Sequence, residues 1–250
     1  MNVRRLALVL PAYNEEGAIE TTVSDALAKL PALLPDFVIV PVNDGSRDAT
    51  GAILDRLAGV HGNRLVPVHN VTNVGYGGSV RAGFDRSLEL DASHVLLMDA
   101  DGQFDIADLA RVLPGLREKD AMLGYRAERN DTNLRKLNAV AWQALVWILY
   151  GVKVRDLACA FKVLPAAFLA SNRMVSGGAM ISAEILVRMR HAGISYEEVA
   201  VRHLPRMTGT ATGARPAVIL RAFVELFRLR SLLRREARQA ATSVELERRP

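Results

Sequence analysis

The chain has 250 residues, of which 50% are hydrophobic and 24% charged, and this composition suits one globular domain with a substantial core. Its single cysteine, Cys159, excludes an intramolecular disulfide and is compatible with a reducing compartment. The net charge of +5 is moderate, and no zinc-ligand cluster or recognised nucleic-acid motif accompanies the basic residues, so we do not expect a nucleic-acid partner.

The first hundred residues alternate apolar, strand-like segments with amphipathic, helix-like segments. We expect strands at residues 6–12, 37–42, 64–70 and 94–100. Helices are expected at residues 14–30, in the second part of 43–58, and at 75–90 after a glycine-rich turn. Such alternation is typical of parallel βαβ units, so the predicted fold class is α/β, with an open, mostly parallel sheet flanked by helices.

Polar residues follow each of the four predicted strands. They are Asn14, Glu15, Asn43, Asp44, Asn73, Asp99 and Asp101. Ligands of open α/β sheets bind beyond the carboxyl ends of the strands, so we expect a ligand site where these residues meet. Each cluster taken alone could instead be a helix cap or a tight turn.

The fourth predicted strand ends in two carboxylates, Asp99 and Asp101, separated by one alanine. Two neighbouring carboxylates repel each other unless positive charge lies between them. A hard divalent cation that also holds the phosphates of a substrate would supply that charge. The glycines at 75, 77 and 78 do not match the dinucleotide fingerprint, and no Walker lysine motif is present, which disfavours hydride-transfer and P-loop enzymes.

The longest uncharged segment covers residues 137–152, about 16 residues, whereas roughly 20 are needed to cross a bilayer. We predict a buried or interfacial helix there, with Trp142, Trp147 and Tyr150 as candidate interface anchors. An ordinary core helix is the alternative.

A basic amphipathic helix is predicted at residues 216–238. Leu220, Phe223, Val224 and Phe227 recur at helical spacing and form one apolar face. Such a helix can lie in the headgroup region of an anionic membrane. Alternatively, its apolar face packs on the domain, on a second copy of the chain in a homo-oligomer, or on a small membrane protein. Residues 239–250 are expected to form a flexible tail.

Several short motifs occur in a characteristic order. They are LPAYNEE (10–16), VNDGSRDAT (42–50), NVGYGG (73–78), MDADGQFD (98–105), GYR (124–126), RDLACAFK (155–162) and the later Arg206. In this order they resemble glycosyltransferase family 2, and within it the dolichol-phosphate mannose synthase-like, polyprenyl-phosphate glycosyltransferases. The resemblance covers about residues 3–230 and implies one GT-A domain at 1–230. Its nucleotide-sugar-binding half would be 1–115 and its acceptor half 116–215, followed by the amphipathic helix.

The resemblance also implies a donor site and a metal site. Residues implied to bind the donor, a GDP- or UDP-linked sugar, are Pro11, Ala12, Tyr13, Glu15, Asp44, Asn73 and Ala100. Asp99 and Asp101 would hold Mg²⁺ or Mn²⁺ against the donor diphosphate, and Gln103 would complete the metal's ligand shell. The cation would then cancel the repulsion between the carboxylates and stabilise the departing nucleoside diphosphate.

In the synthases that this chain resembles, a lipid phosphate attacks the anomeric carbon of the sugar with inversion. Residues implied to hold that acceptor are Arg126, Arg135, Asp156, Lys162 and Arg206. The three arginines would act with the metal-binding carboxylates in catalysis, because the planar guanidinium holds phosphate oxygens in two places at once. The alternatives are arginines that only solvate a surface and an ion pair of Asp156 with Lys162.

A phosphate acceptor is already anionic near neutral pH, whereas a hydroxyl acceptor needs a general base. Asp156 and Glu184 are the evident base candidates in the second half of the chain. The Q-x-x-R-W signature of processive synthases is absent, which favours non-processive transfer. Transfer to a soluble hydroxyl and a non-catalytic nucleotide-sugar-binding subunit remain the alternatives.

Two departures from the family leave the donor sugar and nucleotide open. Asn43 precedes Asp44 where two acids are common, and ACAF at 158–161 replaces the Ser/Thr-Gly-Phe of mannose synthases. The expected location is cytoplasmic, at the inner face of a bacterial-like cell membrane.

Overall fold

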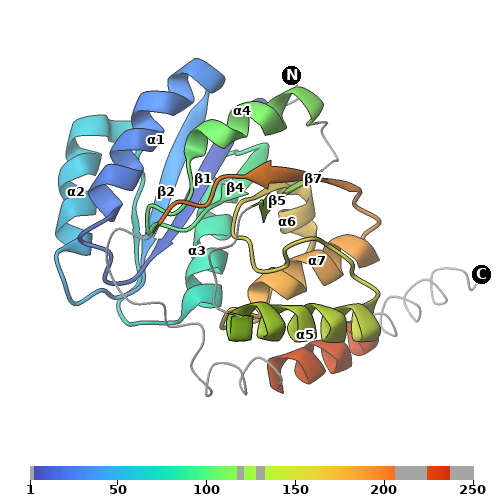
Figure 1. The fold of residues 1–250 in the computed structure, drawn as a ribbon. Coiled ribbons are helices and arrows are strands. Elements are labelled where there is room, and N and C mark those ends of the chain that lie inside the picture. Colours follow the sequence, from blue (N-terminus) through green and yellow to red (C-terminus); the bar gives the residue numbers. More distant parts are fainter. Residues whose placement is uncertain (1–2, 117–120, 128–132, 206–223, 237–250) are drawn as a thin grey trace, which may run out of the picture.

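The computed structural model describes residues 3–116, 121–127, 133–205 and 224–236. Within these ranges, seven strands form one sheet in the order β3-β2-β1-β4-β6-β5-β7 (Figure 1). The strands are β1 Leu6–Ala12, β2 Phe37–Asn43, β3 Val68–His69, β4 His94–Leu97, β5 Ala121–Arg126, β6 Lys162–Pro165 and β7 Tyr196–Val201. The α-helices are α1 Ile19–Leu33, α2 Thr50–His61, α3 Tyr76–Glu89, α4 Leu109–Val112, α5 Asn133–Tyr150, α6 Ala166–Ser171 and α7 Ile181–His191, followed by a helix at 224–236. Short 3-10 helices occur at Gly62–Arg64, Ile106–Asp108 and Leu113–Gly115.

The predicted mostly parallel α/β sheet is confirmed. Strands β1 to β4 pair in parallel, so their carboxyl ends share one edge of the sheet. Strand β6 runs antiparallel to both β4 and β5, and β5 is parallel to β7. The first half of the chain therefore builds the parallel part of the sheet, and the single reversal at β6 joins it to the second half.

Two apolar layers cover the sheet because alternate residues of its central strands point to opposite faces. Leu6, Leu8 and Leu10 of β1 pack with α1, α2 and α4 on one face. Ala7 and Val9 of the same strand pack with α3, α5, α6, α7 and helix 224–236 on the other face. The continuous apolar run in β1 thus reflects a strand that is buried on both sides.

The predicted third strand at residues 64–70 is too long. The structure pairs only Val68 and Val42, and His69 and Asn43, with one isolated bridge from Leu65 to Ile39. Pro67 has no N–H to donate and interrupts the ladder between these points. The other early strands lie where they were predicted, although β4 ends at Leu97, so that residues 98–100 belong to the loop that follows.

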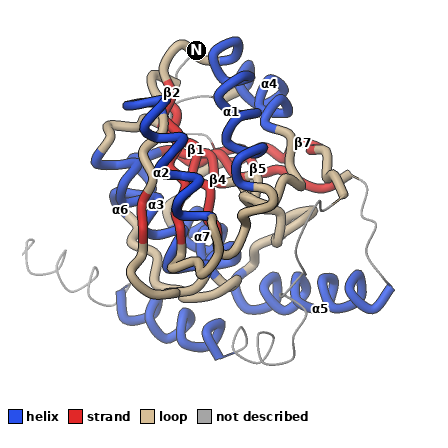
Figure 2. The backbone as a smooth tube through the Cα atoms, turned by 90° about the vertical axis from the view of Figure 1, so that its left-hand side faces the viewer, coloured by secondary structure: helices blue, strands red, loops and turns tan. Residues whose placement is uncertain are grey.

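Helix α5 includes most of the uncharged segment but corrects one predicted anchor. Tyr150 is buried, and its hydroxyl donates a hydrogen bond to the carbonyl of Leu226, 2.5 Å away, in helix 224–236. Trp142 is partly buried, whereas Trp147 is 55% exposed. Both helices lie below the sheet in Figure 1, and Figure 2 shows α5 at the lower margin of the molecule.

Helix 224–236 buries a different face from the apolar face predicted for it. Leu226, Leu229 and Leu233 are buried against the domain, while Val224 and Phe227 are exposed. The other two predicted members of that face, at 220 and 223, lie outside the described residues, as does the tail at 239–250. No helix within the described ranges is long and apolar enough to span a bilayer.

Candidate active site

Asp44, directly after β2, organises the parallel edge of the sheet. Its buried carboxylate accepts hydrogen bonds from the Asn70 side chain and the Val74 and Gly75 backbone N–H groups, each at 2.9 Å. The Asn73 side chain donates to the Asp44 carbonyl at 3.2 Å. These hydrogen bonds therefore hold the turn after β2 against the loop before α3. Asp44 and Asn73, both predicted to bind the sugar donor, meet there.

Asn43 has partners within the same edge. Its side-chain oxygen accepts from the Ser46 N–H at 3.0 Å, and its amide nitrogen lies 3.1 Å from Nδ1 of His69. An amide offers both a donor and acceptors, whereas an ionised aspartate only accepts. This local pairing is the role that the structure gives to the amide at position 43.

The carboxyl end of β1 lies beside Asp44 at the same edge of the sheet. Pro11 and Ala12 are buried within the strand, and the Ala12 carbonyl accepts a hydrogen bond from the Asp44 N–H at 2.9 Å. Tyr13 follows with 41% exposure. The Glu15 N–H donates to the Thr50 hydroxyl at 2.9 Å, so the start of α2 supports this turn. Among these residues predicted to bind the nucleotide sugar, Tyr13 presents an exposed ring beside buried backbone.

The predicted metal-binding carboxylates lie at the same edge, just beyond β4. Asp101 is buried, and its Oδ1 accepts from the Gln103 N–H at 3.0 Å across a turn in which Gly102 has a φ of 74°. Asp99 is half-buried, and its Oδ1 accepts from the Tyr76 hydroxyl at 3.0 Å. The positive φ explains the glycine between the carboxylates and Gln103.

Tyr76 is a site residue that the sequence reasoning missed. Burial of its hydroxyl and the negative charge of Asp99 raise the pKa of Tyr76 well above 10, so it is a neutral hydrogen-bond donor near pH 7. The NVGYGG motif drew attention only to its glycines, because no local signal reveals which distant residue a tyrosine hydroxyl reaches.

The loop after β4 is held from both sides. The Thr22 hydroxyl of α1 donates to the buried Ala100 carbonyl at 3.1 Å. Further along, Asp105 accepts from Lys29 at 3.0 Å and pairs with Arg202 at 2.9 Å. These contacts connect the loop to the first helix and to the residue that follows β7, which fixes its path beside the sheet edge.

The two carboxylates of Asp99 and Asp101, here called the acid pair, are suitable ligands for a hard divalent cation. Two carboxylates supply oxygen ligands of the type that Mg²⁺ and Mn²⁺ prefer. Among the described residues, no group of three or more His, Cys, Asp or Glu side chains is arranged to hold a metal. A cation at Asp99 and Asp101 would therefore take its other ligands from water or from a bound diphosphate, as Mg²⁺ commonly does.

Gln103, the predicted third metal ligand, makes contacts with the segment after β7. Its side-chain nitrogen donates to the Leu204 carbonyl at 3.2 Å, and the Leu204 N–H donates to the Gln103 carbonyl at 2.8 Å. The neighbouring Phe104 forms an isolated bridge with His203. The chain thus passes Gln103 two residues before Arg206, which itself lies outside the described residues.

Arg126 and Asp156, two predicted acceptor residues, form a bidentate ion pair with each other. The Arg126 Nε lies 2.6 Å from Oδ2 of Asp156, and its Nη2 lies 3.0 Å from Oδ1. Their side chains are 15% and 3% exposed. An ion pair of Asp156 with Lys162 was the alternative to an acceptor role, and the structure instead pairs Asp156 with Arg126, whose planar fork matches a carboxylate better than an ammonium does.

Lys162, at the start of β6, is 1% exposed. Its ammonium donates hydrogen bonds to the carbonyls of Leu157 and Cys159. Burial lowers the pKa of Lys162, and the nearby Cys159, Asp156 and Asp99 oppose that effect. Lys162 is therefore buried close to Cys159, Asp156 and Asp99, and its predicted contact with an acceptor stays a prediction. Arg135 belongs to the first turn of α5, and its side chain lies outside the described part.

Glu184, a candidate base, lies on α7. Its fully buried carboxylate accepts from the Val175 and Ser176 N–H groups, at 2.9 and 2.7 Å, and from Nε of Arg188 at 2.8 Å. The other candidate base, Asp156, is held by Arg126. Both acids are thus engaged in internal contacts.

The chain is similar to known proteins along most of its length. A model of the family described as glycosyl transferase family 2 matches residues 7–169. A dodecaprenyl-phosphate galacturonate synthase from Rhizobium johnstonii is 29% identical over 68% of this chain and 50% of its own length. A dolichyl-phosphate beta-glucosyltransferase from Drosophila melanogaster is 30% identical over 79% of this chain and 66% of its own length. The chain thus spans half to about two thirds of these two relatives.

The fold is also similar to that of a solved structure. Glucosyl-3-phosphoglycerate synthase from Mycobacterium tuberculosis, in complex with Mn²⁺, uridine diphosphate and phosphoglyceric acid, aligns with a TM-score of 0.68 at 17% identity. The alignment covers 91% of this chain and 78% of that one. At this identity the likeness concerns the fold, and it agrees with the mostly parallel sheet described above.

Proposed function

The chain belongs to glycosyltransferase family 2, and on that premise we propose that it moves a hexose from a GDP- or UDP-linked sugar to a polyprenyl phosphate with inversion. The observation that carries this proposal is the acid pair at the edge where Asp44 and Tyr13 also lie. Asp99 and Asp101 would hold Mg²⁺ or Mn²⁺ there, as the Mn²⁺ in the M. tuberculosis structure of the same fold also suggests. The bound cation would neutralise charge that develops on the leaving diphosphate.

This edge of the sheet suits a nucleotide because the groups that would contact it are already held in place. Tyr13 offers an exposed ring on which a base can stack, next to the buried backbone of Ala12. The Asp44 carboxylate is already aligned by three N–H donors, so its oxygens are held in place for a further hydrogen bond from a base. Fixed polar groups of this kind orient a ligand without losing side-chain entropy when it binds.

A phosphate acceptor fits this site better than a hydroxyl acceptor. A hydroxyl needs a base, and both candidate bases, Glu184 and Asp156, are occupied by buried N–H donors or by a bidentate arginine. A phosphate monoester carries its own negative charge and needs positive partners instead. Arg135 and Arg206 of the resemblance are proposed partners, together with Arg126, whose guanidinium would then be shared between Asp156 and the phosphate. The two named relatives carry dodecaprenyl-phosphate and dolichyl-phosphate in their names, which supports a polyprenyl phosphate.

We further propose that α5 and helix 224–236 form the surface that meets the membrane in which such an acceptor lies. Val140, Trp147 and Ile148 of α5 are 64%, 55% and 70% exposed and lie on one side of the helix. Helix 224–236 adds Val224 and Phe227, which are 45% and 56% exposed. Exposed apolar side chains gathered on adjacent helices are typical of an interaction surface.

Positive charge accompanies these apolar side chains. Phe227 and Ser231 lie beside the arginines Arg230, Arg234 and Arg235 on one face of helix 224–236. A phenylalanine beside guanidinium groups suits a lipid, whose acyl chain is apolar and whose phosphate is anionic. Anionic bilayers attract basic helices with about 1 kcal/mol for each Lys or Arg near the surface. The protein would then be peripheral on a membrane.

The transfer reaction is tested with radiolabelled nucleotide sugars, Mn²⁺ and polyprenyl phosphate in detergent. The proposal predicts label that extracts into butanol with the lipid and that is lost when EDTA replaces Mn²⁺. Label found only in water-soluble product would favour a hydroxyl acceptor. Metal-dependent nucleotide binding with no turnover for any donor would favour a non-catalytic subunit. Either result would contradict the proposed transfer.

Membrane contact is tested by sedimentation with vesicles. We expect the protein to bind vesicles that contain phosphatidylglycerol and to bind pure phosphatidylcholine vesicles less, with weaker binding at high salt. Equal recovery in the supernatant for both vesicle types would contradict the proposed surface.

A further inference from the structure

Tyr76 connects the glycine-rich segment to the acid pair. It is the first residue of α3, and its hydroxyl donates to Oδ1 of Asp99 at 3.0 Å. A carboxylate can rotate about its side-chain bonds, and a hydrogen bond to one oxygen leaves the other oxygen directed elsewhere. Partners of metal-binding carboxylates act in this way, because they orient the ligand before the metal arrives.

The glycines on either side of Tyr76 allow close packing against the loop between α6 and α7, residues 172–180. Gly75 has a φ of 83°, and a side chain there would meet the Gly177 carbonyl at 2.8 Å. A Cβ on Gly77 would lie only 2.2 Å from the Ser176 carbonyl, and the Gly77 N–H donates to the Gly177 carbonyl at 3.1 Å. The backbone that carries Tyr76 therefore has no room to shift toward this loop.

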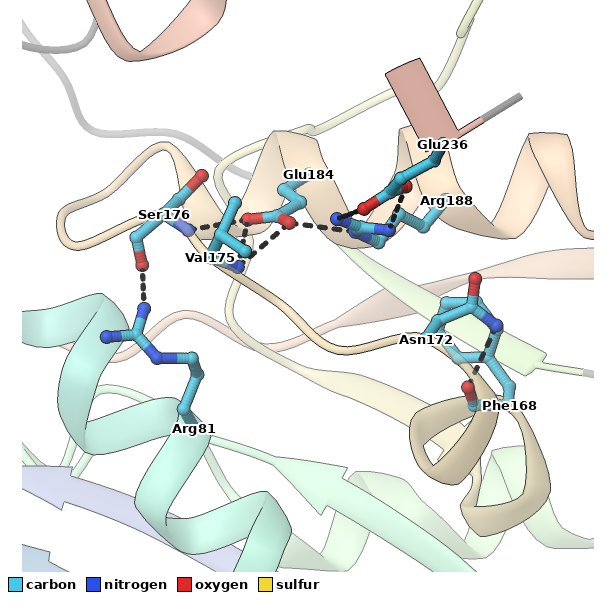
Figure 3. Close-up of polar contacts among 8 residues, drawn as sticks. All are labelled: Arg81, Phe168, Asn172, Val175, Ser176, Glu184, Arg188 and Glu236. Carbon is cyan, nitrogen blue, oxygen red and sulfur yellow. Dashed lines mark hydrogen bonds and ion pairs between the residues drawn. The ribbon is translucent and has the colours of Figure 1, made fainter. Parts of the chain in front are cut away.

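The α6–α7 loop is itself fixed by a chain of polar contacts (Figure 3). Glu184 holds the N–H groups of Val175 and Ser176, and Arg81 of α3 donates to the Ser176 carbonyl. Arg188 binds Glu184 and also pairs with Glu236 of the last described helix at 3.1 Å. On the other side of Tyr76, Asp44 binds the Gly75 N–H. Rigid elements thus support Tyr76 from two sides.

We propose that Tyr76 is a positioning residue for the reaction, which holds the Asp99 carboxylate in the orientation that binds the divalent cation. This inference rests on the proposed metal site at Asp99 and Asp101 and adds a residue to it. Tyr76 would not touch the substrate or the cation. Its effect would be seen as tighter metal binding, because Asp99 does not have to be ordered when the cation enters.

The test measures Mn²⁺ binding alone, by the electron paramagnetic resonance signal of unbound Mn²⁺, in the full chain. Tyr76→Phe keeps the ring and removes only the hydroxyl. The matched control is Tyr196→Phe, which removes a hydroxyl that donates to the Lys153 carbonyl at 2.9 Å. Tyr196 pairs with Ala121, at the opposite end of β5 from Arg126, so the control lies far from the site.

Loss of an outer-shell partner typically weakens metal affinity about 10- to 100-fold. We expect at least about tenfold weaker Mn²⁺ binding for Tyr76→Phe, with Tyr196→Phe within about twofold of the wild type. Melting in EDTA should show a cooperative transition for both variants, because the phenylalanine ring preserves the packing. Equal Mn²⁺ affinity in Tyr76→Phe and the wild type would overturn the role of Tyr76 alone. Wild-type protein that binds Mn²⁺ no better than Asp101→Ala would overturn the metal site itself.

Discussion

The sheet edge at the carboxyl ends of β1 to β4 and the surface formed by α5 and helix 224–236 differ in which side chains they bury. At this edge, polar side chains are buried and accept hydrogen bonds from nearby backbone N–H groups. Asp44 accepts from Val74, and Asp101 accepts from Gln103. On the helices, large apolar side chains such as Trp147 and Ile148 are exposed. A globular domain usually does the reverse in both respects. Fixed polar groups suit recognition of one ligand, whereas an exposed apolar and basic surface needs only area and charge complementarity.

This contrast makes the edge the region least tolerant of change, and Asp101→Ala should have the largest effect. Removing one of the two carboxylates proposed to hold the cation should cost about 100-fold or more in Mn²⁺-dependent affinity for UDP or GDP. Calorimetric titration with and without Mn²⁺ measures this increment. Asp85→Ala, which removes an exposed carboxylate from α3, is the control and should leave affinity unchanged. An Asp101→Ala protein that keeps its Mn²⁺-dependent increment would show that the acid pair is not the site.

The buried polar groups of the edge should also stabilise the fold. Asp44→Asn keeps the shape but replaces one acceptor oxygen by an amide that faces N–H donors. We expect a loss of about 2–3 kcal/mol in the free energy of unfolding, measured by urea denaturation. Asp55→Asn is the comparison, because the Asp55 side chain is 69% exposed and its ion pair within the described residues is with His69 at 3.0 Å. Equal stability of the two variants would break the distinction between the edge and the surface.

The exposed helices should show the opposite sensitivity. Trp147→Ser combined with Ile148→Ser should reduce partition onto anionic vesicles about tenfold, because less apolar area would enter the bilayer. The free energy of unfolding should change by no more than about 0.5 kcal/mol, since both side chains are exposed. Val71→Ser removes an apolar side chain that is 99% exposed in the loop before α3 and serves as the control. Unchanged vesicle binding in the double variant would remove α5 from the proposed surface.

The smallest expected effect concerns pH and the loop after the acid pair. Burial alone would raise the pKa of Asp105, but hydrogen bonds from the Ala107 N–H and Lys29, with the charges of Lys29 and Arg202, lower it below 3.8. Asp105 therefore stabilises the fold above the pKa of an unfolded aspartate, and this contribution is lost as pH falls through its lower folded pKa.

Asp105→Asn should accordingly lower Tm at pH 7, by an amount equivalent to about 1 kcal/mol, and make Tm fall less steeply in acid. Melting curves from pH 7 to pH 3 measure both effects. Asp36 forms an exposed ion pair with Arg5 at 3.8 Å, and Asp36→Asn is the control. It should leave the fall in Tm between pH 7 and pH 3, the acid limb of the curve, unchanged. Parallel acid limbs for Asp105→Asn and the wild type would argue against the role of this carboxylate in holding the loop.

Local patterns were sufficient for the parallel half of the fold. The apolar run at residues 6–12 and the acids after the fourth strand were placed correctly, because strands buried on both faces show continuous apolar stretches. The third strand was predicted too long because the apolar pattern outweighed Pro67, which cannot donate to a ladder. Apolar periodicity therefore locates such strands but does not set their length.

Contacts between distant segments could not be read in this way. The pairing of Arg126 with Asp156 and the bond from Tyr76 to Asp99 join residues 30 and 23 positions apart. On helix 224–236, spacing identified an apolar face at Val224 and Phe227, but Leu226, Leu229 and Leu233 are the buried residues. A helix with apolar residues on two faces does not reveal from its own sequence which face meets the domain.

Anomalous diffraction from a crystal of the full chain soaked with MnCl₂ and UDP tests the central claim most directly. The account predicts one anomalous peak within about 2.5 Å of carboxylate oxygens of Asp99 or Asp101, with the diphosphate on the same ion and the base beside Tyr13. A nucleotide bound elsewhere, with no manganese at the acid pair, would contradict it.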